Sequence, residues 1–153
     1  MLSEGDKAPG FSLATDDGSK VTLASLKGRP AVLFFYPKDD TSGCTLEAND
    51  FTRLMPEFDR LEAAVIGISP DSVASHCKFR DKHDLKVRLA ADEEKTTLEA
   101  YGVWTEKSMY GRKYMGVERS TFLIAADGRI AAIWRKVKVP GHAEAVLKRV
   151  KEL

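Results

Sequence analysis

Residues 31–44 read AVLFFYPKDDTSGC, and this stretch decides the fold. Its first six residues are apolar, as expected of a central strand that is buried on both faces of a sheet. Pro37 ends the strand, and the polar residues after it predict a loop. A helical pattern begins around Cys44. The stretch therefore predicts a strand, a loop and a helix, with a cysteine where the loop meets the helix.

Strand and helix patterns alternate on both sides of this stretch. Apolar residues at three- and four-residue steps over 46–61 predict a helix, which Pro56 should kink or split. Residues 64–68 form a second buried strand, and Ser69-Pro70 predicts the start of a helix towards His83. The other expected elements are a hairpin of 11–13 with 21–23, a strand 87–89, a helix 94–101, a hairpin of 121–124 with 130–134, and a helix 143–150.

The order of these elements predicts the fold class. Strands alternate with helices, and an antiparallel hairpin and a last helix follow. This order predicts an α/β fold with a mixed central sheet flanked by helices and an N-terminal hairpin, and it resembles the thioredoxin-like fold. No repeat, low-complexity tract or linker divides the chain, so we expect a single domain over residues 1–153.

The composition is that of an ordinary globular protein, with 43% hydrophobic and 31% charged residues in 153. Lys and Arg number 24 against 23 Asp and Glu, so the charge gives no reason to expect nucleic acid or an anionic membrane as a partner. The longest apolar run, 31–36, is far shorter than the roughly 20 residues of a membrane helix. The acidic residues 1–6 lack the features of a secretory signal, and we expect a cytoplasmic protein.

Two cysteines make thiol chemistry the question to follow. They are too few for a secreted disulfide scaffold, and with three histidines they provide no ligand set for a zinc cage. Cys44 lies at a predicted helix N-terminus, where unpaired backbone N–H groups and the helix dipole favour a thiolate. Position alone leaves two alternatives open, a reactive thiolate and a small buried apolar residue.

Cys44 also ends a spaced motif. Pro37 is followed by three residues, Thr41, two residues and then Cys44. This pattern resembles the active-site signature of the peroxiredoxins, whose peroxidatic cysteine is the last residue of the motif. The resemblance is best to the bacterioferritin comigratory protein, or peroxiredoxin Q, branch. It continues along nearly the whole chain at residues 5–11, 67–71 and 118–122.

The resemblance implies a thiol-dependent peroxidase that reduces hydrogen peroxide and organic hydroperoxides without a metal or an organic cofactor. The Cys44 thiolate would attack the O–O bond, and Thr41 would hydrogen-bond the peroxide and the thiolate. Pro37 would shield the sulfur from water. Arg119 would stabilise the sulfur and the developing oxyanion, and Glu47 would hold Arg119 in place.

Three of these residues have plainer interpretations. In the plainer interpretation of Thr41, its side chain caps the helix and has no other role. Glu47 is favourable in a first helical turn because of the helix dipole alone. Arg119 can be a surface charge at a strand edge. The sequence leaves these alternatives open.

The second cysteine departs from the commonest pattern of the branch. Many members carry a resolving cysteine five residues after the peroxidatic one, where this chain has Asn49, and Ser42 replaces a frequent proline. Cys77 is the remaining candidate. It lies on the helix after Ser69-Pro70, about one turn before position 80, where some members place their resolving cysteine. Positions 77 and 80 share a helical face.

If Cys77 resolves the sulfenic acid, we expect the two thiols to start too far apart to bond, because the alpha carbons of a disulfide lie within about 7 Å. The helix at Cys44 would then have to unwind locally. Thioredoxin or a similar dithiol protein would then reduce the disulfide. A one-cysteine cycle resolved by an external thiol of the glutathione or glutaredoxin type stays open. So does a non-catalytic thioredoxin-like binding domain with an inert Cys44.

The remaining polar residues suggest no further site. We expect the three histidines, His76, His83 and His142, at the surface or at helix ends rather than on a metal. Residues 134–139 alternate like a strand with a basic outer face, which is solvated or, alternatively, docks an acidic reductase. Residues 109–112 read as a loop. By resemblance to the branch we expect a monomer.

Overall fold

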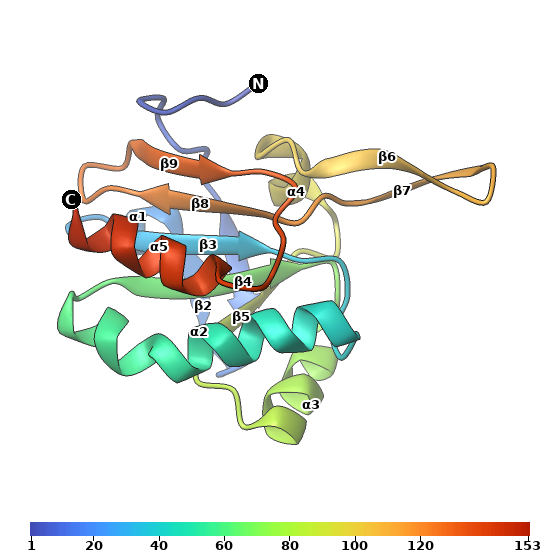
Figure 1. Ribbon diagram of the computed structural model, residues 1–153, viewed down its shortest axis with the longest axis horizontal. Coiled ribbons are helices and arrows are strands. Elements are labelled where there is room, and N and C mark those ends of the chain that lie inside the picture. Colours follow the sequence, from blue (N-terminus) through green and yellow to red (C-terminus); the bar gives the residue numbers. More distant parts are fainter.

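A computed structural model describes residues 1–153 and builds them around a seven-stranded mixed sheet (Figure 1). The strand order is β2-β1-β5-β4-β3-β8-β9. At its centre, β3 runs parallel to β4 and antiparallel to β8. The strands are β1 (Ser12–Thr15), β2 (Lys20–Thr22), β3 (Ala31–Phe35), β4 (Ala64–Ser69), β5 (Arg88–Ala91), β8 (Ser120–Ile124) and β9 (Ile130–Trp134).

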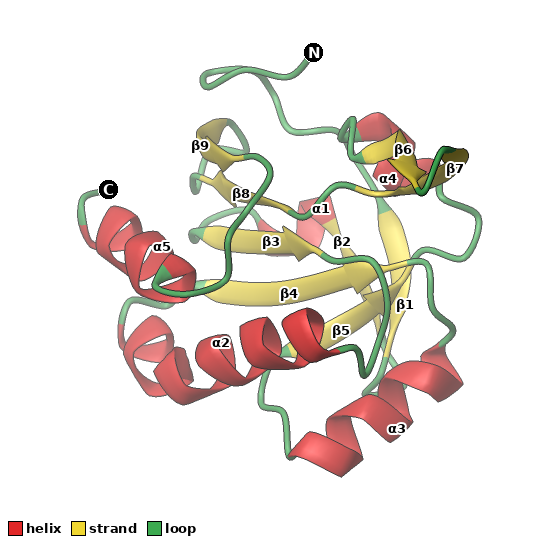
Figure 2. Cartoon of the chain, turned by 45° about the vertical axis from the view of Figure 1, so that its right-hand side comes forward, coloured by secondary structure: helices red, strands yellow, loops and turns green.

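Helices cover both faces of this sheet (Figure 2). Successive side chains of β3 point to opposite faces, so Val32 and Phe34 enter one core while Leu33 and Phe35 enter the other. The first core is closed by α2, α3 and α5, and the second by α1, α4 and the N-terminal hairpin. The helices are α1 (Leu23–Leu26), α2 (Ser42–Arg60), α3 (Val73–His83), α4 (Thr96–Ala100) and α5 (His142–Lys151).

The predicted α/β fold with a mixed sheet and an N-terminal hairpin is confirmed. The buried strand read from residues 31–36 is β3, and the hairpin expected from residues 121–124 and 130–134 is formed by β8 and β9. All five residues of β3 are buried, which explains why its sequence is a continuous apolar run. No helix is long and apolar enough to cross a membrane.

Two helix boundaries differ from expectation. Helix α2 is not split at Pro56 but continues through it to Arg60. Proline removes one helical hydrogen bond, and Phe51 and Phe58, both fully buried on either side, supply packing that outweighs this loss.

Helix α3 begins later than the sequence suggested. Its N-cap is Ser72, whose side chain accepts a hydrogen bond from the backbone N–H of Ser75. Ser69 is instead the last residue of β4, and its hydroxyl donates to Asp71. Ser69 pairs with Ala91 in the sheet, so β4 extends through Ser69 and the helix begins after Ser72 instead.

The sequence did not predict the ribbon of β6 (Trp104–Met109) and β7 (Arg112–Val117), which projects from the body in Figure 1. The expected loop 109–112 contains its turn, in which Tyr110 and Gly111 adopt positive φ angles of 52° and 76°. Such angles suit a two-residue hairpin. Most ribbon side chains are half-buried or exposed, so no apolar alternation marked these strands. The predicted strand 134–139 was wrong beyond Trp134, where β9 ends.

Candidate active site

Cys44 is the third residue of α2, and 2% of its surface is exposed. The loop between β3 and α2 delivers it to the first helical turn. Backbone N–H groups of a first turn have no intrahelical acceptor, and the helix dipole adds partial positive charge there. The sulfur therefore lies where negative charge is favoured and bulk water is largely excluded.

Arg119 connects Cys44 to Glu47. Its Nη2 donates to the Cys44 Sγ at 3.2 Å, and its Nη1 donates to the Glu47 Oε1 at 2.7 Å. The side chain is 17% exposed, so Arg119 is not a surface charge. Gly43 makes this approach possible, since a Cβ at that position would lie 3.2 Å from the Arg119 Nη2. One guanidinium thus donates hydrogen bonds to both a thiol and a carboxyl group.

Glu47 is almost completely buried in the same helix. Burial raises the pKa of its carboxyl group from 4.5 to about 7, although the charge of Arg119 and its hydrogen bond act in the opposite direction. The Glu47 Oε2 has no hydrogen-bond partner and lies 4.0 Å from the Nε2 of His142. Near neutral pH, this carboxyl group is poised between its neutral and charged forms.

His142 begins α5 and closes the site on the side of Glu47. Its Nε2 lies 2.7 Å from the Thr121 Oγ1, and its ring meets Trp134 edge-on at 5.8 Å. Burial and the nearby Arg119 charge lower its pKa to about 4, so the imidazole is neutral at neutral pH. We expected this histidine at the surface or a helix end; it is at a helix end but 7% exposed.

Pro37 and Thr41 lie in the loop that leads to Cys44. Pro37 is half-buried directly after Tyr36, and Thr41 is the N-cap residue of α2. The Thr41 hydroxyl donates to the carbonyl oxygen of Lys38 at 2.9 Å and makes no side-chain cap hydrogen bond. The hydroxyl bonds neither to the sulfur nor to the helix backbone, so Thr41 occupies the N-cap position without the side-chain hydrogen bond that the capping interpretation requires.

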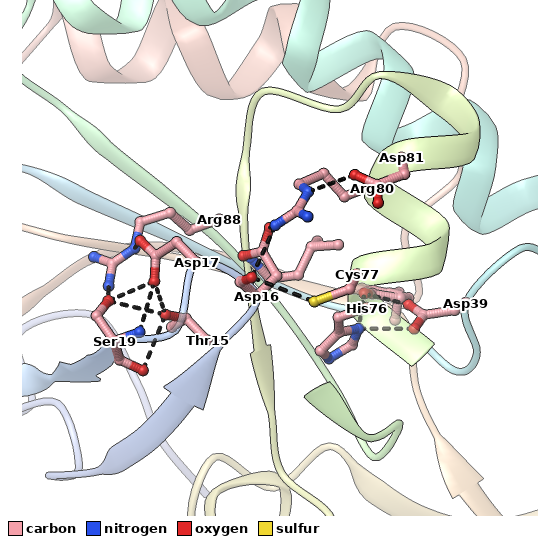
Figure 3. Close-up of polar contacts among 12 residues, drawn as sticks. Thr15, Asp16, Asp17, Ser19, Asp39, His76, Cys77, Arg80, Asp81 and Arg88 are labelled. Carbon is pink, nitrogen blue, oxygen red and sulfur yellow. Dashed lines mark hydrogen bonds and ion pairs between the residues drawn. The ribbon is translucent and has the colours of Figure 1, made fainter. Parts of the chain in front are cut away.

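Cys77 lies apart from this group. It is half-buried on α3, and its Sγ donates to the carbonyl oxygen of Asp16 at 3.4 Å (Figure 3). Arg80 donates to the same carbonyl oxygen at 2.8 Å. Both cysteines are free thiols. The structure thus brings Cys44, Arg119 and Glu47 together, whereas Cys77 contacts the turn between β1 and β2.

His76 lies in the first turn of α3, which agrees with the expected helix end, but it is not at the surface. It is fully buried in α3, beside Cys77, and its Nδ1 lies 2.7 Å from the Oδ2 of Asp39 (Figure 3). An isolated histidine on a weakly amphipathic helix gave no signal of burial, because its partner lies far along the chain. The carboxylate that satisfies it belongs to the polar loop before Cys44.

Comparisons with known proteins agree with this geometry. The model of the AhpC/TSA family matches residues 4–133. The peroxiredoxin Bcp of Bacillus subtilis is 48% identical over 149 residues, which cover 97% of this chain and 95% of the relative. The chain belongs to the AhpC/TSA family of peroxiredoxins. The peroxiredoxin Bcp of Escherichia coli is similar to it at 39% identity, covering 99% and 97% of the two chains.

The fold of this peroxiredoxin is also similar to those of solved structures. A cysteine-to-serine variant of Xylella fastidiosa PrxQ has a TM-score of 0.94 at 39% identity, covering 99% of this chain and 97% of that chain. The bacterioferritin comigratory protein of Xanthomonas campestris has a TM-score of 0.89 at 44% identity, covering 93% and 90%. These matches confirm the thioredoxin-like fold and the peroxiredoxin Q resemblance. The peroxiredoxin is a thiol-dependent peroxidase, an oxidoreductase that acts on a peroxide and is recycled by a thiol reductant.

Proposed function

We propose that Cys44 is the peroxidatic residue for hydrogen peroxide and organic hydroperoxides. Its thiolate attacks one oxygen of the O–O bond, which breaks as the S–O bond of a sulfenic acid forms. The other oxygen leaves with the electron pair and takes up a proton, giving water or an alcohol. The observation that carries this proposal is the 3.2 Å contact between the Arg119 Nη2 and the Cys44 Sγ.

Arg119 and Glu47 act on the charge of this reaction. Negative charge moves from the sulfur to the departing oxygen, and a fixed guanidinium beside the sulfur stabilises both ends of that movement. Glu47 holds one arm of the guanidinium at 2.7 Å, which leaves the other arm aimed at the sulfur. Pro37, which has no N–H, shields the thiolate from water and limits the motion of the loop.

The Thr41 hydroxyl is proposed to hydrogen-bond the bound peroxide. It now donates to the Lys38 carbonyl oxygen, and a rotation about χ1 can redirect this exposed donor to a peroxide oxygen. Replacing Thr41 by valine should slow oxidation of Cys44 about tenfold, the value of one neutral hydrogen bond, while Thr41→Ser keeps most of the rate. Stopped-flow oxidation of the reduced variants measures this. Equal rates for valine and threonine would remove Thr41 from the mechanism.

Cys77 is proposed as the resolving residue. The sulfenic acid of Cys44 condenses with the Cys77 thiol to form an S–S bond and release water, and thioredoxin or a similar dithiol protein reduces the disulfide. The Cys77 Sγ now contacts Asp16 and the Cys44 Sγ contacts Arg119, so the starts of α2 and α3 must rearrange before the two sulfurs can bond. A cycle resolved by an external thiol is the second candidate, because Cys77 does not contact Cys44 in the folded site.

One equivalent of hydrogen peroxide separates the two cycles. After quenching with a thiol blocker, the wild-type chain should lose about two mass units and keep both thiols protected, as expected of a disulfide. Cys77→Ser should instead gain about 16 or 32 units, the mass of one or two oxygen atoms. Its steady-state turnover with thioredoxin should fall at least about tenfold. Cys44→Ser should show neither mass change, which tests the peroxidatic role separately.

The substrate range and the setting of the protein are part of the proposal. The similar Xanthomonas campestris protein is described by its alkyl peroxide reduction activity, which supports organic hydroperoxides as substrates here. The chain packs around one continuous sheet, so we propose that residues 1–153 act as one domain. By resemblance to the branch we propose that this domain acts as a monomer. Two free thiols fit a reducing compartment such as the cytoplasm.

A further inference from the structure

Asp39 lies at the centre of a buried group of polar side chains next to the catalytic loop. It stands between Pro37 and Thr41 and is 8% exposed. Its Oδ1 accepts a hydrogen bond from the Tyr36 hydroxyl at 2.7 Å. Its Oδ2 accepts one from the Ser75 hydroxyl at 2.7 Å and lies 2.7 Å from the Nδ1 of His76 (Figure 3). We call Tyr36, Asp39, Ser75 and His76 the Asp39 latch.

The latch fixes the loop to two other parts of the fold. Ser75 and His76 belong to the first turn of α3, and the Nε2 of His76 lies 3.0 Å from the carbonyl oxygen of Ala90 in β5. The backbone N–H of Asp39 donates to the Oδ2 of Asp71 at 2.8 Å. The loop that carries Pro37 and Thr41 is therefore held against α3 and the sheet by buried Tyr36, Asp39 and His76 and by half-buried Ser75 and Asp71.

A second, exposed contact joins the same two elements. Asp40 accepts from the Lys82 Nζ at 2.7 Å and lies 2.8 Å from the Nε2 of His83, both in the last turn of α3. These side chains are partly solvated, and exposed ion pairs stabilise little. The buried Asp39 contacts are therefore the stronger connection between the loop and α3.

Cys77 follows His76 directly in α3. The latch therefore joins the segment before Cys44 to the helical turn that carries Cys77. Separating these segments removes the partners of a buried carboxylate and a buried imidazole, which costs free energy. The Cys77 Sγ contacts the carbonyl oxygen of Asp16 in the folded helix, so the turn of α3 that carries Ser75, His76 and Cys77 must unwind before this sulfur can bond to Cys44. The unwinding removes Ser75 and His76 from Asp39.

We propose that Asp39 is a positioning residue with opposite effects on the two steps of the catalytic cycle. By fixing the loop in the folded arrangement it speeds the attack of Cys44 on peroxide. By holding the loop to α3 it slows the condensation of the Cys44 sulfenic acid with the Cys77 thiol. The second effect rests on the resolving role proposed above for Cys77, and the first does not.

Two tyrosines of this chain provide a matched test. Tyr36→Phe removes one hydroxyl that donates to Asp39, whereas Tyr101→Phe removes one that donates to the carbonyl oxygen of Pro9, far from the latch in sequence. Both rings are buried, so the two variants lose the same chemical group in similar packing. Reduced protein is mixed with one equivalent of hydrogen peroxide, and sulfenic acid and disulfide are followed by quenched-flow mass measurement.

In Tyr36→Phe the oxidation of Cys44 should be slower and disulfide formation faster, each by about two- to tenfold, the range of one hydrogen bond. Tyr101→Phe should change both rates by less than twofold. Ser75→Ala removes a different donor to Asp39 and should reproduce the opposite signs. Both rates falling together in Tyr36→Phe and Ser75→Ala, or neither changing, overturns the proposal, since a merely structural role slows both steps.

Amide hydrogen exchange keeps this test independent of Cys77. The first turn of α3 in reduced Tyr36→Phe should exchange about two- to tenfold faster than in Tyr101→Phe. If the wild type forms no disulfide, the resolving role of Cys77 fails while this comparison still stands. Equal exchange rates in the two variants would show that the Tyr36–Asp39 contact does not hold the first turn of α3, even if the wild type does form the disulfide.

Discussion

Replacing Arg119 by methionine should slow the oxidation of Cys44 by hydrogen peroxide at least about 100-fold, in the range seen when a preorganised donor is removed from a transition state. The guanidinium is the charged group that touches the sulfur, and it is fixed by Glu47. Methionine keeps a similar length without charge or donors. Stopped-flow measurement of second-order oxidation rates at neutral pH checks the prediction.

Two further variants separate chemistry from folding. Arg119→Lys keeps one positive charge but cannot reach Cys44 and Glu47 with two donors, so it should recover only part of the rate. Arg53→Met removes an exposed arginine paired with Glu144 and should leave the rate within about twofold. If Arg119→Met is folded and oxidises within about threefold of the wild type, Arg119 does not assist the reaction.

Removing Arg119 also leaves the Glu47 carboxyl group buried without its cation, which predicts a loss of stability. The double substitution of Glu47→Gln with Arg119→Met removes both members of the pair and should be more stable than Arg119→Met alone. It should not recover the oxidation rate. A recovered rate would mean that Arg119 matters only for folding.

The sequence predicted best where one pattern had one physical meaning. The apolar run 31–36 could only be buried on both faces, and β3 is buried throughout. The motif from Pro37 to Cys44 located the reactive loop because its spacing is local. The β6–β7 ribbon was not predicted because its side chains are mostly half-buried or exposed and so show no alternation of apolar and polar residues. Its turn also depends on a positive φ at Tyr110, and tyrosine is not a residue type that indicates such a turn.

The polar contacts around the site could not be read in the same way. Asp39 and His76 are 37 positions apart, and Thr121 and His142 are 21 apart, so each pair meets only through the tertiary fold. An isolated histidine is more often solvated than buried, and periodicity does not report its partner. Arg119 was identified by resemblance alone, whereas its link from Cys44 to Glu47 became visible only in the structure.

Glu47 should make the stability of the folded protein depend on pH in a direction opposite to that of an ordinary carboxylate. Its pKa is about 7 when folded, because burial disfavours the charged form, against an ordinary value of 4.5 when unfolded. The stabilisation is therefore fully present below pH 4.5 and is lost as the pH rises through about 7. A shift of this size corresponds to about 3 kcal/mol in the free energy of unfolding.

The substitution Glu47→Gln keeps the shape of the side chain and removes its titration. The unfolding free energy of Glu47→Gln minus that of the wild type should therefore rise by about 3 kcal/mol between pH 4.5 and pH 8, measured by urea unfolding of the reduced proteins. His142, whose pKa is lowered, destabilises the folded protein at acid pH instead, but this effect cancels because the wild type and Glu47→Gln both contain His142. Glu57→Gln removes a carboxylate at 43% exposure and should follow the wild type at both pH values. Parallel pH profiles for Glu47→Gln and the wild type would show that Glu47 stays charged in the folded protein, held as a carboxylate by Arg119.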